Sequence, residues 1–501
     1  MNRGKAAGPF SIPTHILKDY GELIVNPLHC IINKSLREGI FPTLLKTARI
    51  CPIFKKGDSM NCGNYRPISL LSNLSKIFER LFYNQLEHFL DVHDLIYKLQ
   101  FGFRKKYSTN HALLSIVEKI RHNLDKGNFA CGVFVDLEKA FDTVNHNILL
   151  SKLEHYGIRG RENQWVKSFL TNRDQFVNLN NCTSSNKTIT CGVPQGSILG
   201  PLLFTIYIND MNKAIIDCLT HHFADDTNLL YAHKDPNVIR KVVNKDLALL
   251  FQWLCANRLS LNVAKTEFII FRPPRKNLPE RIVLKLNNTK IFESYNIKYL
   301  GLLMDTRLNW KAHIHELSKK LSQAIGMLYN IRKSCNQQVL LSLYHAIFNS
   351  HMTYGLPIWG NTTKSILYRI YLLQKKALRA ISYSGYNDSS SPIFKNLNIL
   401  KLNDQYDYQL ASLLWDLDHD TLPPSLASYF NKINETHSHE TRQATANKYK
   451  VNRANTLYGK NSFQIKGSEF LNKLKSTDIY DNALSKSNFL KSYKKSIVES
   501  Y

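Results

Sequence analysis

Apolar residues recur at every third or fourth position in several stretches of the chain, the spacing of an amphipathic helix. Residues 74–90 form the first stretch, which Ser72 or Asn73 can cap, and residues 110–124 form a second. After about residue 306 three further apolar stripes predict a helical region. The stripes are Ile314, Leu317, Leu321, Ile325, Leu328 and Ile331; Val339, Leu340, Leu343, Tyr344, Ile347 and Phe348; and Ile366, Leu367, Ile370, Leu373, Ala377, Leu378 and Ile381.

Two short segments have the character of strands. Residues 130–136, ACGVFVD, are rich in β-branched and aromatic residues and predict a buried strand that ends at Asp136. Residues 221–231, HHFADDTNLLY, predict a hairpin with Asp225 and Asp226 at or near its turn. Between these segments lie two predicted helices, about 143–156 and 162–171, and the turn-rich string GVPQGSILGP.

Length and charge narrow the class of protein. The 501 residues correspond to about three domains. Lys and Arg number 66 against 39 Asp and Glu, a net charge of +27 that points to a polyanionic partner, either nucleic acid or an anionic membrane. The longest apolar run, 198–208, is broken by Gly and Pro and is far shorter than the roughly 20 residues that span a bilayer. Nucleic acid is therefore the favoured partner, and no membrane partner is expected.

The nine cysteines include no CxxC pair, which argues against a disulfide scaffold and against a zinc ribbon. Reduced thiols and an intracellular location fit this usage better. The N-terminal string MNRGKAAGPF has no apolar run and does not resemble a secretory signal.

Asp136, Asp225 and Asp226 share a placement at strand ends. Grouped carboxylates repel one another and call for a cation, and their hard oxygen atoms suit magnesium. Two such ions can activate an attacking hydroxyl and stabilise a leaving pyrophosphate. The alternative is ordinary turn chemistry, in which Asp pairs are common. We interpret Asp142 as a structural or capping acid, and the pair His221–His222 as structural or as a nucleic-acid contact.

The surrounding strings decide between these interpretations. In chain order they resemble the palm and fingers motifs of reverse transcriptases, most closely those of non-LTR (LINE-type) retrotransposons of the Jockey-like group, over residues 1–385. The strings are NYRPISLLSNLSKIFERL (64–81), QFGFRKKYST (100–109), GVFVDLEKAFDTVNH (132–146), GVPQGSILGPLLFTIYIND (192–210), FADD (223–226), LSLNVAKTEFIIF (259–271) and YLGLLMD (299–305).

The resemblance implies an α+β fold, the right-hand polymerase with fingers, a palm built on a ferredoxin-like antiparallel sheet, and a helical thumb. It divides the chain into an N-terminal extension with fingers (1–125), a palm (126–305), a thumb (306–385) and a basic C-terminal region of uncertain fold (386–501).

The resemblance also implies a catalytic centre. Asp136 and Asp225 are expected to bridge two Mg²⁺ ions, which Mn²⁺ could replace, with Asp226 less essential. Lys265 matches a lysine that could protonate the leaving pyrophosphate or serve as a phosphate contact, and the sequence leaves both roles open.

Four residues match the nucleotide pocket of the family. Arg66 is expected to contact the triphosphate, since a guanidinium offers forked donors to phosphate oxygens. Phe141 occupies the position of a steric gate against the ribose 2′-hydroxyl. Gln195 and Gly196 match the motif that lines the nucleotide and the template base.

Two residues match the template–primer side. Phe223 stands where the family usually has tyrosine, and its ring is expected beneath the primer end. Arg104 could touch the template or only hold the fingers.

We therefore expect an RNA-directed DNA polymerase that extends a DNA 3′-hydroxyl on an RNA template. Its partners would be the RNA template, a DNA primer or target and deoxynucleoside triphosphates, in the cytoplasm and nucleus. No endonuclease segment is recognised, so a mobile element would need that activity from elsewhere. Two alternatives remain: a decayed or domesticated nucleic-acid-binding protein that does not catalyse, and a group II intron maturase-like splicing factor.

Overall fold

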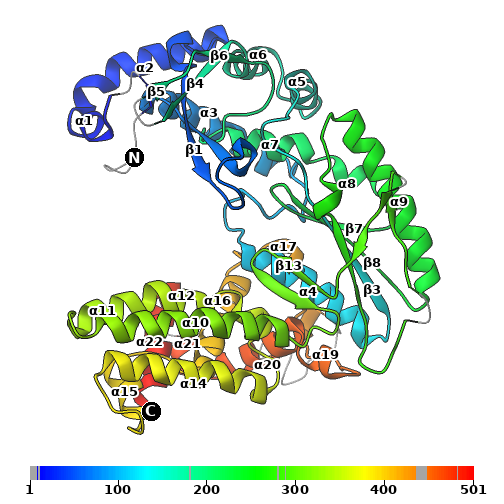
Figure 1. The fold of residues 1–501 in the computed structure, drawn as a ribbon, viewed down its shortest axis with the longest axis vertical. Coiled ribbons are helices and arrows are strands. Elements are labelled where there is room, and N and C mark those ends of the chain that lie inside the picture. The colour runs from blue at the N-terminus through cyan, green and yellow to red at the C-terminus, as the bar shows by residue number, and fades with distance from the viewer. Residues whose placement is uncertain are drawn as a thin grey trace.

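The computed structural model describes residues 8–9, 12–179, 182–278, 281–287, 289–435, 448–481 and 483–501. Figure 1 shows a curved molecule with three parts: an N-terminal lobe, a central antiparallel sheet, and a helical region that carries the C-terminus. Within the described ranges, no helix combines the length and apolar character needed to cross a membrane.

The central sheet has the strand order β12-β9-β3-β8-β7. Strand β3 lies in the middle and pairs antiparallel with both β8 and β9. Leaving out the short parallel edge strand β12, the order is fourth, first, third, second along the chain, the ferredoxin-like arrangement. The predicted α+β palm fold is thereby confirmed. The strands are β3 (Phe129–Val135), β7 (Leu219–Phe223), β8 (Asp226–His233), β9 (Glu267–Phe271) and β12 (Phe292–Glu293).

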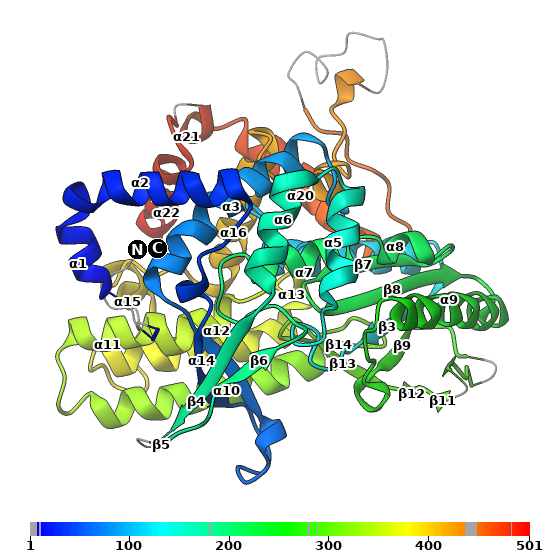
Figure 2. The same cartoon turned by 90° about the horizontal axis from the view of Figure 1, so that it is seen from above.

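Both faces of this sheet are covered, so β3 is buried along its whole length. Cys131 and Val133 point into the core shared with α7 (Gly200–Ile208) and α9 (Pro236–Ala256), which runs alongside β8 (Figure 2). Alternate residues such as Phe134 point into the other core, which is shared with α4 (Thr109–Asp125) and with the helical region. A strand buried on both faces reads as a continuous apolar run, which explains the ACGVFV string.

The N-terminal lobe contains a second sheet of order β2-β1-β4-β5, with β6 paired to β4. Strand β4 lies parallel to β1, so residues 173–189 lie with the N-terminal strands although they follow β3 in the chain. The strands are β1 (Ala48–Phe54), β2 (Tyr65–Leu70), β4 (Arg173–Leu179), β5 (Cys182–Thr183) and β6 (Lys187–Ile189). The helices of this lobe are α1 (Thr14–Asp19), α2 (Gly21–Glu38), η1 (Thr43–Leu45), η2 (Cys62–Asn64), α3 (Asn73–Val92), α5 (His146–His155) and α6 (Gly160–Leu170).

Further short elements lie between the strands of the central sheet or between this sheet and the helical region. They are α8 (Met211–Ala214), η3 (Val263–Lys265), β10 (Lys285–Leu286), β11 (Thr289–Lys290) and the hairpin of β13 (Asn296–Tyr299) and β14 (Leu302–Asp305). The helical region then begins with α10 (Lys311–Ile331), α11 (Gln337–Leu343), a π-helix (Tyr344–Asn349), α12 (Ser350–Thr353), α13 (Leu356–Trp359) and α14 (Lys364–Ile381).

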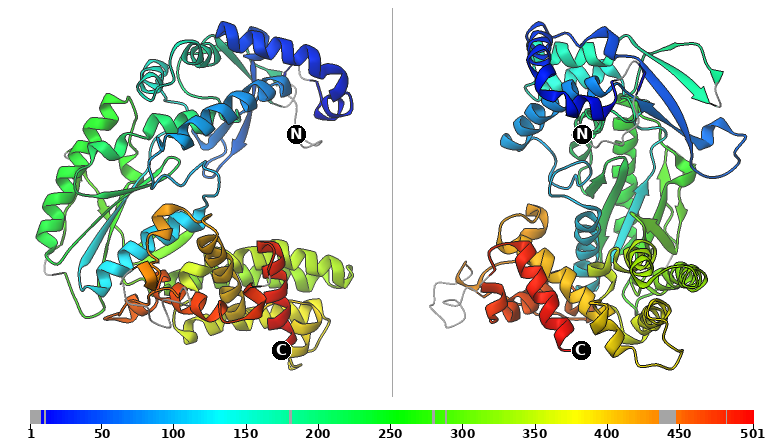
Figure 3. Two further views of the ribbon diagram at one scale, coloured as in Figure 1. Left: turned by 180° about the vertical axis from the view of Figure 1, so that it is seen from behind. Right: turned by 90° about the vertical axis from the view of Figure 1, so that its left-hand side faces the viewer.

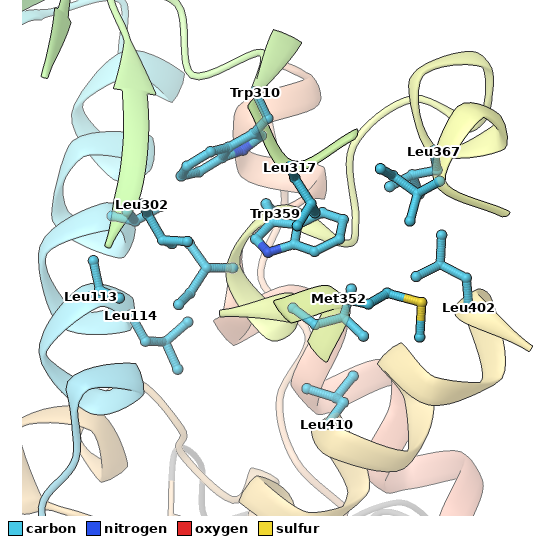
Figure 4. Packing of buried hydrophobic residues seen from close by; sticks show 14 of the residues in the cluster. Leu113, Leu114, Leu302, Trp310, Leu317, Met352, Trp359, Leu367, Leu402 and Leu410 are labelled. Atoms are coloured by element: carbon cyan, nitrogen blue, oxygen red, sulfur yellow. The ribbon is translucent and has the colours of Figure 1, made fainter. Parts of the chain in front are cut away.

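The predicted apolar stripes of α10 and α14 face one core. Leu317 and Leu367 lie in it together with Trp310 and Trp359 (Figure 4). Leu302 of the β14 strand extends the same core to α4 of the central part.

Residues beyond 386, which we predicted as a basic region of uncertain fold, form helices where the structure describes them. They pack beside α10 and α14 (Figure 3), and Phe463, Leu471 and Phe489 enter the same core. The helices are α15 (Ser391–Asn396), α16 (Leu402–Asp418), α17 (Pro424–Ala427), η5 (Ile433–Glu435), α19 (Leu457–Lys460), α20 (Phe463–Leu474), α21 (Asp478–Asp481) and α22 (Lys486–Glu499).

Candidate active site

The hairpin of β7 and β8 brings two of the predicted carboxylates to the end of β3. Phe223 pairs with Asp226, so Ala224 and Asp225 form a two-residue turn between the strands. Ala224 has φ +57°, a left-handed conformation that is uncommon for alanine. Asp136 follows the last residue of β3 directly, and Val135 pairs with Thr227 of β8. The three acids therefore lie at one end of the sheet, as the sequence predicts.

The QFGF segment holds this turn in place. The Phe101 amide donates to the His222 carbonyl at 2.8 Å, and the Gln100 side-chain oxygen accepts from the amides of Gly102 at 2.9 Å and Ala224 at 3.2 Å. A Cβ atom on Gly102 would stand 2.2 Å from the Ala224 nitrogen. Only glycine permits this approach, which explains the residue in the motif.

The carboxylates repel one another. Burial, followed by the charge of Asp136, raises the pKa of Asp225, while Lys55 and Arg66 oppose that shift. Burial and the charges of Asp225 and Asp136 raise the pKa of Asp226 to about 6, although its side chain is still partly open to solvent. A cation between these groups would relieve the repulsion.

Their chemistry suits magnesium, which takes one or two carboxylates and completes its shell with water and substrate phosphates. Among the described residues, no three His, Cys, Asp or Glu side chains stand close enough to enclose an ion by themselves. The carboxylates fit a magnesium ion whose remaining ligands are water and substrate phosphates.

Lys265 lies beside this group. Its Nζ atom is 3.6 Å from Asp136 Oδ2, and its side chain is largely exposed. The backbone fixes this position, because the Asn262 amide donates to the Asp136 carbonyl at 2.9 Å and the Asp136 amide donates to Thr266 Oγ1 at 3.4 Å. The lysine can screen Asp136 and reach a substrate phosphate.

Gln195 and Gly196 connect the turn-rich loop to β2, the strand that carries Arg66. The Ser69 amide donates to the Gln195 carbonyl at 2.7 Å. Gly196 has φ +126°, and a Cβ atom there would lie 2.4 Å from the Ser69 carbonyl oxygen. The close packing of loop on strand therefore requires glycine.

Asp142 contacts the Gln195 side chain. Gln195 Nε2 donates to Asp142 Oδ1 at 2.8 Å, which fixes the amide orientation. Burial raises the pKa of Asp142, and the hydrogen bond from Gln195 opposes this shift. Our interpretation of Asp142 as a structural or capping acid missed this contact, although the residue directly follows Phe141 in the motif.

Phe141 is a half-buried ring at the edge of the core. It stacks on Phe204 with a centroid distance of 4.4 Å and meets Phe103 edge-on at 6.1 Å. Its carbonyl accepts from the Val193 amide at 2.8 Å, next to the loop that carries Gln195. The Phe141 ring therefore packs against the hydrophobic core, and it also lies beside the loop of Gln195 and Gly196 that we predict to line the nucleotide.

Arg104 and Phe223 both lie close to the segments that form the aspartate turn. Arg104 Nη1 donates to the carbonyls of Tyr97 at 3.3 Å and Gln100 at 3.4 Å, and its guanidinium covers the Tyr107 ring at 4.2 Å. These contacts brace the loop that holds the aspartate turn. Phe223 is half-buried directly before the turn.

A sequence profile described as reverse transcriptase (RNA-dependent DNA polymerase) matches residues 53–304. The chain belongs to this family. The family predicted from the motifs is thereby confirmed.

Curated relatives of this reverse transcriptase chain include two polymerases of Drosophila mobile elements. The RNA-directed DNA polymerase from mobile element jockey of Drosophila melanogaster is 31% identical over 412 residues, which covers 80% of this chain and 44% of the relative. The probable RNA-directed DNA polymerase from transposon BS of the same species is 30% identical, covering 75% of this chain and 43% of the relative. The chain thus spans less than half the length of both.

Solved structures similar to it include telomerase from Candida tropicalis in complex with a fragment of telomeric RNA. That structure has a TM-score of 0.41 at 14% identity and covers 94% of this chain and 67% of its own. Apo telomerase from the same species has a TM-score of 0.40 at 13% identity, covering 81% of this chain and 72% of its own.

Lys55 is a candidate for the site of this reverse transcriptase that could not be picked out from the sequence. It follows β1, and its amide donates to the Asn64 carbonyl at 2.9 Å across the hairpin. Its charge lowers the pKa of both Asp225 and Asp226, against their repulsion. The signal available in the sequence is the exposed Lys pair in IFKKGD, close before YRPIS.

Glu79 of α3 is the second missed residue. Its side chain is fully buried, and Oε2 accepts from the amides of Ile198 at 2.6 Å and Leu199 at 3.3 Å. Burial raises its pKa, and the hydrogen bond from Ser75 and those two amides oppose the shift. Glu79 therefore ties the segment that follows Gln195 and Gly196 to the N-terminal lobe.

The pair His221–His222 is structural. Both rings are buried, and burial lowers the pKa of His221 to about 3 and that of His222 to about 4. His221 bonds Ser115 at 3.2 Å and His222 bonds Thr227 at 3.0 Å. Neutral rings inside the core do not reach nucleic acid.

Proposed function

We propose that this protein is an RNA-directed DNA polymerase of a non-LTR retrotransposon, which extends a DNA 3′-hydroxyl on an RNA template by two-metal nucleotidyl transfer. The proposal is supported by the acidic group at the end of β3, where burial and neighbouring negative charge raise the pKa of Asp225 and of Asp226 within a strongly basic chain. Family membership supplies the reaction class, and this group supplies a place for it.

Asp136 and Asp225 would hold two Mg²⁺ ions together with the substrate phosphates, with Asp226 less essential and Mn²⁺ as a substitute. When bound, such ions activate the attacking hydroxyl and stabilise the leaving pyrophosphate. Lys265, 3.6 Å from Asp136, would donate a proton to that pyrophosphate or contact its charge.

The nucleotide would lie between the acids and the N-terminal lobe. Arg66 and Lys55, whose charges act on Asp225, would meet its triphosphate. Gln195, oriented by Asp142, would line the base and sugar. Phe141 would exclude a ribose 2′-hydroxyl.

Partners follow from this reaction. They are an RNA template, a DNA primer or target and deoxynucleoside triphosphates, met in the cytoplasm and nucleus. Phe223 would lie beneath the primer end, and Arg104 would act by bracing the adjacent loop.

Primer extension tests the proposal. The purified chain is given a DNA primer annealed to an RNA template, deoxynucleoside triphosphates and either Mg²⁺ or a chelator. We expect template-directed extension only with the metal, and none from Asp136→Asn. A chain that binds the template–primer but extends nothing with Mg²⁺ or Mn²⁺ would instead be a non-catalytic nucleic-acid-binding protein.

A further inference from the structure

A large pocket lies where the central sheet, the helical region and the C-terminal segment meet. Its volume is about 850 Å³. Arg121 of α4 lines it together with four segments: residues 273–275 after β9, 307–311 before α10, 361–366 at the start of α14, and 455–461 around α19. Figure 1 places α14 and α19 on the side of the molecule away from the N-terminal lobe.

The pocket is remote from the aspartates. Phe271 pairs with Ala130 near the beginning of β3, whereas Asp136 follows the end of that strand. At about 3.3 Å per residue, the strand separates the two places by roughly 20 Å. The pocket is therefore no part of the polymerase site described above.

The charged side chains that line this pocket are positive. Arg275, Arg307 and Lys311 are exposed there, and none of them forms an ion pair with a described residue. No Asp or Glu occurs among the described residues that line the pocket. Such a surface attracts an anion.

Two acids, Asp125 and Asp305, lie close to the pocket, and both accept hydrogen bonds from backbone amides. Asp125 accepts from the amides of Asn455 at 3.1 Å and Thr456 at 2.7 Å. Asp305 accepts from the amides of Arg307 at 3.0 Å and Trp310 at 2.9 Å. Neither carboxylate is directed at the three cations, so their charge remains available to a ligand.

Two long helices begin at the pocket. Helix α10 starts at Lys311 with 21 residues, and α14 starts at Lys364 with 18 residues. Thr363, the residue before α14, makes no side-chain hydrogen bond that would cap this helix. Helix N-termini add partial positive charge, which suits phosphate oxygens. At α10 the amides of Trp310 and Lys311 are already bonded, to the side chains of Asp305 and Asn309.

The walls also offer apolar surface. Tyr458 and Ile366 line the pocket, and Leu457 is 70% exposed at its edge. Aromatic and apolar side chains beside a row of cations are the combination that binds the bases and backbone of a single strand. A small inorganic anion would leave most of this surface unused.

We propose that this pocket binds a single-stranded nucleic-acid segment outside the polymerase site, with Arg275, Arg307 and Lys311 on its phosphates and Tyr458 on a base or sugar. The identity of the partner as nucleic acid rests on the proposed function. The site would hold a part of the RNA, or of the target DNA, that is not paired at the aspartates.

Binding to two substrates tests this site. One is a minimal RNA–DNA template–primer, and the other carries a single-stranded extension of about 10 nucleotides, the range of a single-strand-binding fold, as RNA or as DNA. The pocket variant is Arg275→Ala/Arg307→Ala/Lys311→Ala. The matched control is Lys213→Ala/Arg240→Ala/Lys241→Ala, which removes the same charge from the exposed surface of α8 and α9.

We expect the pocket variant to weaken binding of the extended substrate at least tenfold, while binding and extension of the minimal substrate stay as in the wild type. The slope of log affinity against log salt should fall by about 2, since each single-strand phosphate contributes about 0.7. The control should leave the slope unchanged. The extension, RNA or DNA, whose binding is weakened more by the pocket variant identifies which strand the pocket binds.

Equal weakening of both substrates, no weakening, or the same weakening in the control would each overturn the site. Failure of the wild type to extend the minimal substrate, with the pocket effect intact, would overturn the proposed function alone.

Discussion

The pKa values of carboxylates near the two ends of the central sheet are shifted in opposite directions. At the end of β3, Asp225 and Asp226 have raised pKa values, because burial and neighbouring negative charge act on them together. Near the start of β3, burial raises the pKa of Asp125, but hydrogen bonds from Thr456, Asn455 and the neighbouring backbone outweigh it and hold this pKa below its usual range.

This difference in pKa distinguishes an acid with a structural role from acids that are candidates for a role in the reaction. Asp125 meets its donors within the protein and joins α4 to the C-terminal segment. Asp225 and Asp226 keep their repulsion in the folded protein, which favours binding of an external cation. A carboxylate that the fold leaves under strain from its neighbours is a candidate for function.

The largest expected effect on stability lies at the structural end. Arg121 donates to the carbonyls of Asn461 at 2.7 Å and Ile358 at 2.8 Å, and lies 3.4 Å from the buried carboxylate of Glu118. Arg121→Met would leave Glu118 buried without its counter-charge, which costs about 3–5 kcal/mol in unfolding free energy. Chemical denaturation measures this cost, and Arg240→Met on the exposed face of α9 is the control. A cost below about 1 kcal/mol would show that the seam between α4 and the C-terminal segment is not structural.

At the end of β3, we expect smaller effects on activity from residues that only orient other side chains. Asp142→Ala frees the Gln195 amide, and the KM for deoxynucleotide should rise about tenfold with little change in unfolding free energy. Asp142→Asn keeps an acceptor oxygen and should recover most of the loss. In a Gln195→Ala background the Asp142→Ala effect should vanish. An additive effect would remove the assignment of Asp142 as the residue that orients Gln195.

Asp407 of α16, in the helical region, is another acid whose pKa is raised. Burial and the charge of Asp404 raise its pKa to about 6, with Lys473 opposing. Because the folded state disfavours the ionised form, this acid destabilises the protein above pH 6, and the penalty disappears as the pH falls toward 4. Asp407→Asn should therefore raise the unfolding free energy by on the order of 2 kcal/mol at pH 8 and by almost nothing at pH 4. A gain that is equal at both pH values would contradict this cause.

Much of the site could be predicted because its residues lie in contiguous strings. Asp136 ends an apolar strand and Asp225 lies in a two-residue turn, and both features are local. Glu79, Lys55 and Asp142 could not be found in this way. Glu79 contacts Ile198 across 119 residues, and Asp142 contacts Gln195 across 53, so their roles exist only once the fold has formed.

The fold shows the same distinction between local features, which the sequence predicts, and contacts between distant segments, which it does not. The strand at 130–136, the hairpin around Asp225 and the stripes of α10 and α14 follow from residue periodicity. The pairing of β4 with β1 does not, because 118 residues (55–172) lie between those strands and parallel pairing leaves no turn signal. In the C-terminal region the Ser- and Asn-rich segments obscure short helices whose burial depends on α4.

The most direct test of the central claim measures activity and stability together in Asp225→Asn. Removing one charge from the acidic group should abolish Mg²⁺-dependent primer extension, by more than about a hundredfold. It should leave the unfolding free energy at pH 8 unchanged or higher, because repulsion with Asp136 and Asp226 is relieved. Extension at the wild-type rate, or a protein that becomes less stable, would contradict the assignment of these carboxylates to catalysis.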